Sequence, residues 1–126
     1  MRTNLPVTQQ EYDYPGDELL MSTTDAQGNI THCNAAFMRV SGFTFEELIG
    51  QPHNIVRHPD MPPEAFKDLW GTVGHGRSWV GMVKNRRKDG DHYWVHANVT
   101  PLMEGGKPRG YMSVRAKPTR AQIDQA

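Results

Sequence analysis

The chain has one cysteine, no excess charge of either sign and no long apolar run, and each absence excludes a class of protein. Cys33 alone cannot form an internal disulfide, so we expect a protein of a reducing compartment. The 14 Lys and Arg residues equal the 14 Asp and Glu residues, which argues against nucleic-acid and anionic-lipid partners, because both select basic surfaces. No run approaches the roughly 20 apolar residues of a membrane helix, and the N-terminus lacks a signal-peptide pattern. We therefore expect a cytosolic segment without membrane contact of its own; whether it is the soluble end of a longer membrane protein stays open.

The remaining composition is typical of one globular domain. A chain of 126 residues with 37% hydrophobic residues is large enough for one core. Residues 1–18 are polar and lack a helical period, so we expect an N-terminal arm or cap outside the core. Residues 19–117 carry the strand and helix patterns of the domain. Residues 118–126 are interpreted as the start of a linker to a downstream region.

Turn and cap signals divide the domain into strands and short helices. Strands are predicted at 19–24 and 30–33 around a turn at Gly28, and three longer ones at 79–84, 92–102 and 110–116. Between the two groups, Asn34 and Thr44 are expected to cap short helices, and Pro62 and Pro63 to open a longer one. The order predicts an α+β fold, a five-stranded antiparallel sheet with short helices covering one face. A ligand cavity between helices and sheet is the natural site.

Several short motifs occur in an order that resembles the PAS family. They are Asp25–Ile30, Asn34–Phe37, Ser41–Phe43, Glu46–Gly50 and Arg87–Gly90, and the likeness covers about residues 19–117. Within that family, residues 51–62 and 84–95 resemble the sensor domains of bacterial aerotaxis receptors. The resemblance implies a PAS fold, FAD bound non-covalently, and redox, oxygen or energy sensing. It further implies a homodimer that signals through a HAMP segment to a chemotaxis output, as the cytosolic sensor of an inner-membrane receptor.

The segment from His53 to Asp60 is the first candidate for the ligand site. Arg57, His58 and Asp60 place a cation, a titratable ring and an anion within four residues. An arginine fork suits a phosphate or a flavin carbonyl, so these residues are predicted to bind the cofactor. The alternative is a local Arg57–Asp60 pair with His58 as a capping donor.

The opposite wall is predicted from strand alternation. If Asn85 faces inward, then Val83, Gly81 and Trp79 do so too, because alternate strand residues share a face. Asn85 and Trp79 are then cofactor contacts, with Gly81 admitting a planar ring; the alternative is a core tryptophan and a turn-facing asparagine. Three further residues have two readings each: Asn34 is a helix cap or a ligand contact, and Phe66 and Trp70 are core residues or lining of the cofactor cavity.

The sequence departs from the light-sensing flavin branch of the family at three positions. The adduct-forming cysteine of that branch falls near Ile55 here, a flavin-binding asparagine is replaced by Val95, and the usual glutamine of the last strand by Arg115. The resemblance therefore implies a flavin that cycles by redox chemistry without a thiol photoadduct.

Two other functions remain open alongside a flavin sensor. One is a haem-binding gas sensor with His53 or His58 as an axial ligand, and the other is a cofactor-free protein-interaction module. An enzyme is not expected, because no catalytic constellation is present. His92 and His96 lack a third metal ligand, so no metal site is predicted. Alternation also places apolar residues on the outer sheet face, where an interface is expected: Val80, Met82, Trp94, Met112 and Val114.

Overall fold

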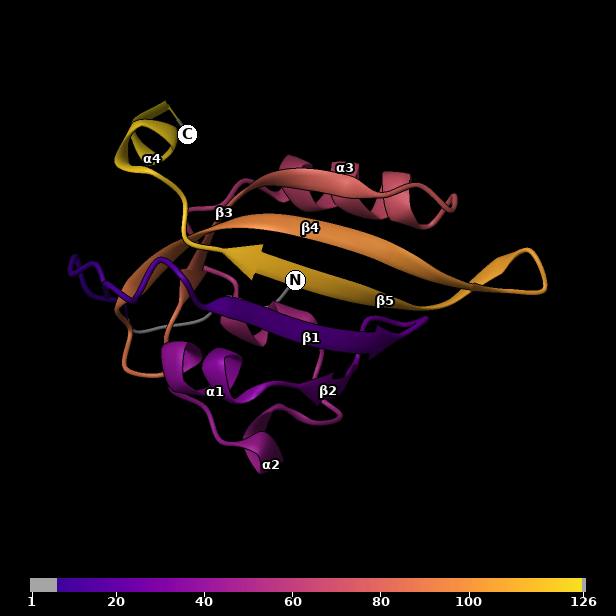
Figure 1. Ribbon diagram of the computed structural model, residues 1–126, viewed down its shortest axis with the longest axis horizontal. Coiled ribbons are helices and arrows are strands. Elements are labelled where there is room, and N and C mark those ends of the chain that lie inside the picture. Colours follow the sequence, from indigo (N-terminus) through magenta and orange to yellow (C-terminus); the bar gives the residue numbers. More distant parts are fainter. Residues whose placement is uncertain (1–6, 126) are drawn as a thin grey trace.

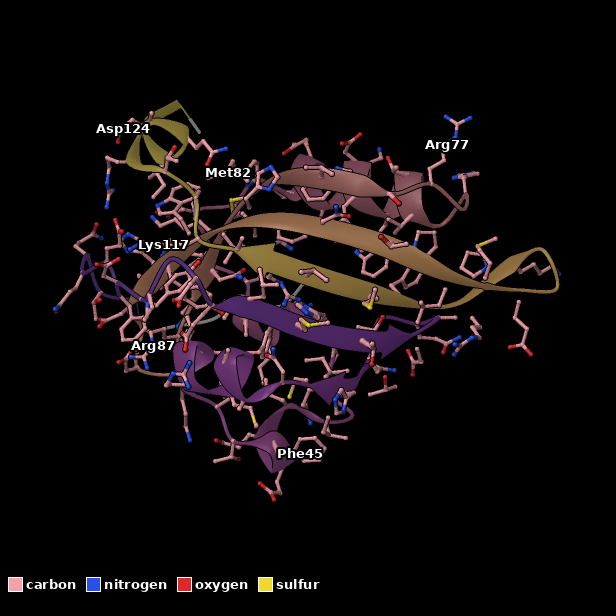
Figure 2. All side chains as sticks on the ribbon, viewed as in Figure 1. Phe45, Arg77, Met82, Arg87, Lys117 and Asp124 are labelled. Carbon is pink, nitrogen blue, oxygen red and sulfur yellow. The ribbon has the colours of Figure 1, made fainter. Side chains whose placement is uncertain are left out.

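The computed structural model describes residues 7–125, which form one sheet with helices packed against it (Figure 1). None of the helices in this range has both the length and the apolar character needed to cross a bilayer. The elements in chain order are β1 (Leu19–Asp25), β2 (Ile30–Cys33), α1 (Ala35–Ser41), α2 (Phe45–Leu48), η1 (His53–Val56), α3 (Pro63–Val73), β3 (Trp79–Arg86), β4 (His92–Glu104), β5 (Lys107–Ala116) and α4 (Arg120–Gln125).

The five strands form one antiparallel sheet in the order β2-β1-β5-β4-β3, which confirms the predicted fold. The chain's first long strand, β1, pairs with its last, β5, while β3 and β4 form a hairpin. Figure 1 shows α1 and α2 beside the β1–β2 end of the sheet and α3 beside β3 and β4. The helices connecting β2 to β3 therefore extend across the sheet.

Local signals in the sequence account for the helix boundaries. Asn34 caps α1, its side chain accepting a hydrogen bond from the backbone N–H of Phe37 at 2.9 Å. Thr44 and Glu47 form a reciprocal capping box at the start of α2. Proline opens α3 in its first turn, where a missing N–H costs no helical hydrogen bond.

The core lies between the helices and the inner face of the sheet. Its fully buried side chains come from both layers, as amphipathic helices and alternating strands require. Alternation is visible on β3, where Val83 is 8% exposed and Val80 is 53% exposed, although Arg86 at the end of the strand is buried beside Asn85. The largest fully buried side chains are Leu20, Ile30, Phe37, Val40, Leu48, Val56, Val73, Tyr93 and Val95.

The N-terminal arm enters the core, contrary to expectation. Residues 1–6 lie outside the described part of the chain, but Tyr14 is buried at 5% exposure and its hydroxyl donates to the carbonyl of Trp94 at 2.8 Å. The backbones of Gln10 and Tyr12 also bond to His92 at the start of β4. The prediction that residues 1–18 lie outside the core is therefore wrong for Tyr14, because an aromatic ring with one polar tip can be buried in an otherwise polar segment.

Candidate functional site

A cavity of about 240 Å³ lies between the inner face of the sheet and the segment from η1 to α3. Its walls are mainly apolar, with a small number of polar groups among them, which is the usual composition of a small-molecule site. The apolar lining comes from Val56, Phe66, Leu69, Trp70, Val83, Ala97, Val99 and Tyr111, and the polar lining includes Thr24, His53, Asn54, Arg57, Asn85, Ser113 and Arg115.

Strand alternation explains the sheet wall of the cavity. Val83 and Asn85 line it from β3, Ala97 and Val99 from β4, and Tyr111, Ser113 and Arg115 from β5. Within each strand these positions are two residues apart, so they share the inner face. The predicted inward orientation of Asn85 and Val83 is what the structure shows: Asn85 is 4% exposed.

Helix periodicity explains the opposite wall. Phe66, Leu69 and Trp70 lie at three- and four-residue steps of α3 and all line the cavity. Trp70 is 41% exposed and its ring meets Tyr111 edge to face at 5.2 Å between centroids. A Cβ at Gly28, whose φ of 86° favours glycine, would stand 3.4 Å from the Trp70 ring. Trp70 therefore borders the mouth of the cavity against the β1–β2 turn.

Arg57 and Asn85 are brought together across the cavity wall. Residue 57 is the C-cap that follows η1, and it forms an antiparallel bridge with residue 85 on β3. The Arg57 guanidinium is buried, lies 4.3 Å from the Phe66 ring centroid and donates to the carbonyl of Met61 at 3.4 Å. A cation and an amide, the first held over an aromatic face, thus flank one region of the cavity.

Sequence reasoning did not identify the group formed by Arg115, His53 and Ser22. Arg115 is 3% exposed and donates to the carbonyl of Leu20 at 3.2 Å and to Oγ of Ser22 at 2.7 Å. A third bond goes to Nε2 of His53, 62 positions away in sequence. The guanidinium also lies 4.8 Å from the ring centroid of Phe37. Arg115 was recognised only as a departure from the light-sensing branch, and no local pattern links it to His53.

Burial sets the protonation of this group. Desolvation lowers the pKa of His53 to about 3, with a further contribution from the positive charge of Arg115. Desolvation also lowers the pKa of Arg115 to about 10. At neutral pH the imidazole is therefore uncharged and the guanidinium charged. Because arginine can only donate, Nε2 of His53 accepts and the ring proton lies on Nδ1.

His58 and Asp60 follow Arg57 in sequence but do not line the cavity. The buried His58 ring accepts the backbone N–H of Asp60 on Nδ1 at 3.0 Å, and burial is the main reason that its pKa is lowered. Asp60 is exposed and pairs with Lys84 at 2.9 Å, and that hydrogen bond is the largest cause of its lowered pKa. The structure therefore favours local roles for these two residues, but Lys84 rather than Arg57 is the partner of Asp60, and His58 accepts a hydrogen bond instead of acting as a capping donor.

Trp79 and Asn34 also lie outside the cavity lining. The Trp79 indole covers Gly81, where an added Cβ would come within 2.4 Å of the ring, and its Nε1–H donates to Asp68 on α3 at 2.9 Å. The space above Gly81 is thus filled by the indole and not left for a ligand ring. Asn34 accepts from the N–H groups of Phe37 and Met21 and donates to the carbonyl of Leu19, which makes it the N-cap. Of the eight predicted contacts, Arg57, Phe66, Trp70 and Asn85 line the cavity, and Asn34, His58, Asp60 and Trp79 do not.

Comparisons with known proteins agree with this architecture. Residues 30–115 match the PAS fold family. The chain is 57% identical over 117 residues to the aerotaxis receptor of Escherichia coli (strain K12), covering 93% of this chain and 23% of that receptor. It is 32% identical over 83 residues to the nitrogen fixation regulatory protein of Klebsiella pneumoniae, covering 66% of this chain and 17% of that protein. The chain thus spans less than a quarter of either relative.

Solved structures with low sequence identity share the fold. The light-state LOV domain of the blue-light photoreceptor Aureochrome1 matches with a TM-score of 0.75 at 18% identity, covering 84% of this chain and 89% of that one. A light-oxygen-voltage domain studied with a flavin analogue matches with a TM-score of 0.77 at 20% identity, covering 86% and 83%. At these identities the likeness concerns the backbone architecture.

Proposed function

Because this chain belongs to the PAS fold family, we propose that it is a sensory domain whose cavity binds a flavin and whose output depends on the flavin's redox state. The observation that carries the proposal is the joint placement of Arg57 and Asn85 on the wall of an otherwise apolar cavity. Apolar walls suit the two faces of a planar ring, and a guanidinium with an amide suits the nitrogen and oxygen atoms at a ring edge.

The size of the cavity agrees with a flavin ring. A volume of about 240 Å³ is just below the range of roughly 300–1,000 Å³ found for ligand pockets. It suits a ring system rather than a whole dinucleotide, so we propose that the rest of the cofactor leaves through the mouth bordered by Trp70. When bound, a flavin supplies reversible electron transfer, and the surrounding protein groups tune its potential.

FAD is the flavin that we propose, on the basis of the 57% identity to an aerotaxis receptor. We extend the proposal to that receptor's sensory role, in which the domain reports redox, oxygen or energy status to a chemotaxis output. The cytosolic side of an inner-membrane receptor, a homodimer and a HAMP segment following the domain belong to the same proposal. The outer sheet face, with Val80 and Met21 exposed, offers an apolar surface for such partners.

Haem has less support from the cavity. His53 lines it, but Nε2 of His53 already accepts a hydrogen bond from Arg115, and a metal ion would meet the guanidinium there. His58, the other proposed axial ligand, lies outside the lining.

The visible spectrum of the purified protein tests the proposal. We expect the two-banded yellow spectrum of a flavin, and chromatography of the released cofactor should identify FAD. Arg57→Ala and Asn85→Ala should reduce flavin retention, whereas Arg109→Ala, at an exposed position on β5, should match the parent. A single intense Soret band would indicate haem, and a colourless protein that binds no added FAD would leave an interaction module.

A further inference from the structure

Glu11 connects the N-terminal arm to the helix at the other end of the domain. Its carboxylate accepts two hydrogen bonds from the guanidinium of Arg120, the first residue of α4, at 3.1 and 2.9 Å. A second ion pair joins Asp13 of the arm to Lys117, just before α4. Residue 11 also forms a parallel bridge with His92 at the start of β4. Figure 1 shows α4 standing apart from the sheet, so Glu11 links a helix outside the sheet to the start of β4.

His92 lies beside the same carboxylate. Its Nε2 is 4.0 Å from Oε1 of Glu11, the oxygen that also accepts a hydrogen bond from Arg120. The His92 side chain is 14% exposed, whereas that of Arg120 is 63% exposed. Exposed ion pairs contribute little net stability, while a charge that is shielded from water acts more strongly on its neighbours. A charge on His92 would therefore compete effectively with Arg120 for Glu11.

The inner nitrogen of His92 can take up a proton without losing a hydrogen bond. Nδ1 of His92 and Nε2 of His58 are both buried and have no hydrogen-bond partner among residues 7–125. The two rings meet edge to face, with 6.0 Å between their centroids. The Glu11 carboxylate favours the proton of a neutral His92 ring on Nε2. Nδ1 of His92 is then a free base.

His58 is the poorer proton site of the two histidines. Its Nδ1 accepts the backbone N–H of Asp60 at 3.0 Å, so the neutral ring carries its proton on Nε2. A second proton on this ring would displace the bond to Asp60. The first proton that enters the pair is therefore expected on His92.

The charges around His92 place its protonation in mild acid. Burial is the largest cause that lowers the pKa of His92, followed by the positive charge of Lys84. Three carboxylates oppose this shift, so the charged ring is not excluded. It forms below the ordinary histidine value of 6.5. The groups that act on the two rings are Glu11 of the arm, Asp60 after η1, Lys84 and Arg86 of β3, and Asp91 of the β3–β4 turn.

We propose that His92 is a proton-binding site that controls the attachment of α4 to the domain. Near pH 7 the ring is uncharged and Glu11 pairs with Arg120. Uptake of one proton from solvent gives the ring a positive charge, which attracts Glu11 and repels Arg120, so the guanidinium leaves the carboxylate. The device needs no flavin. Only its use as a signal rests on the proposed function, in which a HAMP segment follows the domain.

Nuclear magnetic resonance of this chain between about pH 7 and pH 5 tests the proposal. The ring signals of His92 report its protonation, and the backbone amides of Ala121 and Ile123 report α4. A short helix without tertiary contacts is marginal in water, so we expect these amides to lose about half or more of their helical shift. The loss should have the same midpoint as the His92 ring. Amides that stay in place while His92 titrates, or a ring that does not titrate in this range, would overturn the proposal.

Two variants separate the switch from a structural role. His92→Gln keeps a polar side chain that takes up no proton, so α4 should keep its helical shift throughout the range. Glu11→Gln removes the carboxylate, so the helical shift should be reduced already near pH 7. His32→Gln, at an exposed histidine of β2, is the matched control and should behave as the parent. A merely structural His92 would lower the melting temperature on substitution and leave the transition of α4 unaltered.

The two proposals fail in distinguishable ways. A chain that binds no flavin, but whose α4 signals follow His92, overturns the flavin proposal alone. A chain that binds flavin, but whose α4 transition is unchanged in His92→Gln, overturns the proton switch alone.

Discussion

Mild acid should destabilise this domain through His53. Burial lowers the pKa of the folded imidazole from 6.5 to about 3. Since the folded pKa lies below the unfolded one, the unfolded state binds more protons between these values. The stability that the neutral ring contributes is therefore present above about pH 6.5 and is lost as the pH falls towards 3.

The size of the effect follows from proton uptake by the unfolded chain. Each pH unit over which only the unfolded state is protonated is worth about 1.4 kcal/mol. Integrated from pH 7 to pH 5, with values of 6.5 and about 3, the loss reaches up to about 2 kcal/mol. The acidic groups with lowered pKa values titrate at lower pH, so they contribute little in this window.

Urea denaturation followed by tryptophan fluorescence at pH 7 and pH 5 measures the loss. His53→Gln is the informative variant, because its amide oxygen can still accept from Arg115 but does not titrate. His58 and His92, whose pKa values burial also lowers, are present in both proteins and cancel in the comparison. We expect the parent to lose up to about 2 kcal/mol more than His53→Gln, and His32→Gln, at an exposed histidine, to follow the parent. Equal losses in parent and His53→Gln would refute the reasoning.

Three further substitutions test which residues act on the cavity and which act elsewhere in the domain. Asn34→Ala should cost about 1 kcal/mol of stability, the usual value for an N-cap, measured by denaturation; loss of flavin affinity in the folded variant would contradict its place outside the cavity. Trp70→Ala should speed release of the flavin several-fold in a stopped-flow displacement assay, because the ring borders the mouth beside Gly28; an unchanged rate would argue for another exit. Val114→Glu, on the outer face, should disturb signalling by the receptor that we propose this domain serves, while the flavin stays bound; normal signalling would contradict an interface on that face.

The fold was predictable because its signals are local. The turn at Gly28, the caps at Asn34 and Thr44, and the Asp89–Gly90 turn act within a few residues of sequence. Alternation along β3 then fixes which side chains face the cavity. The burial of Tyr14 in the N-terminal arm was harder to predict, because the strands that cover it lie far from it in sequence.

Half of the candidate site could not be predicted from local pattern. Arg57 reaches the cavity, but the chain then turns, so Nδ1 of His58 accepts from the backbone N–H of Asp60 and the Asp60 carboxylate pairs with Lys84. Trp79 alternates with Val83 and Asn85 on β3 as predicted. Its indole nevertheless packs against Gly81 and donates to Asp68 instead of lining the cavity. Parity gives the face of a side chain and not its direction along that face, which rotamer choice and packing decide.

Arg115 departs from the rule that inward-facing positions of a buried strand carry apolar side chains. Tyr111, Ser113 and Arg115 share the inner face of β5, and an inward arginine contradicts the apolar pattern of a buried strand position. Its partners come from β1 and η1, with Leu20 95 positions and His53 62 positions away, so no short motif reports them. Violations of local preference that the surrounding structure holds in place are expected at functional sites. A charged residue at a strand position that alternation places on the inner face is therefore a signal of a functional site that the sequence does carry. In this chain that signal identifies Arg115, the residue that the buried hydrogen bonds also identify.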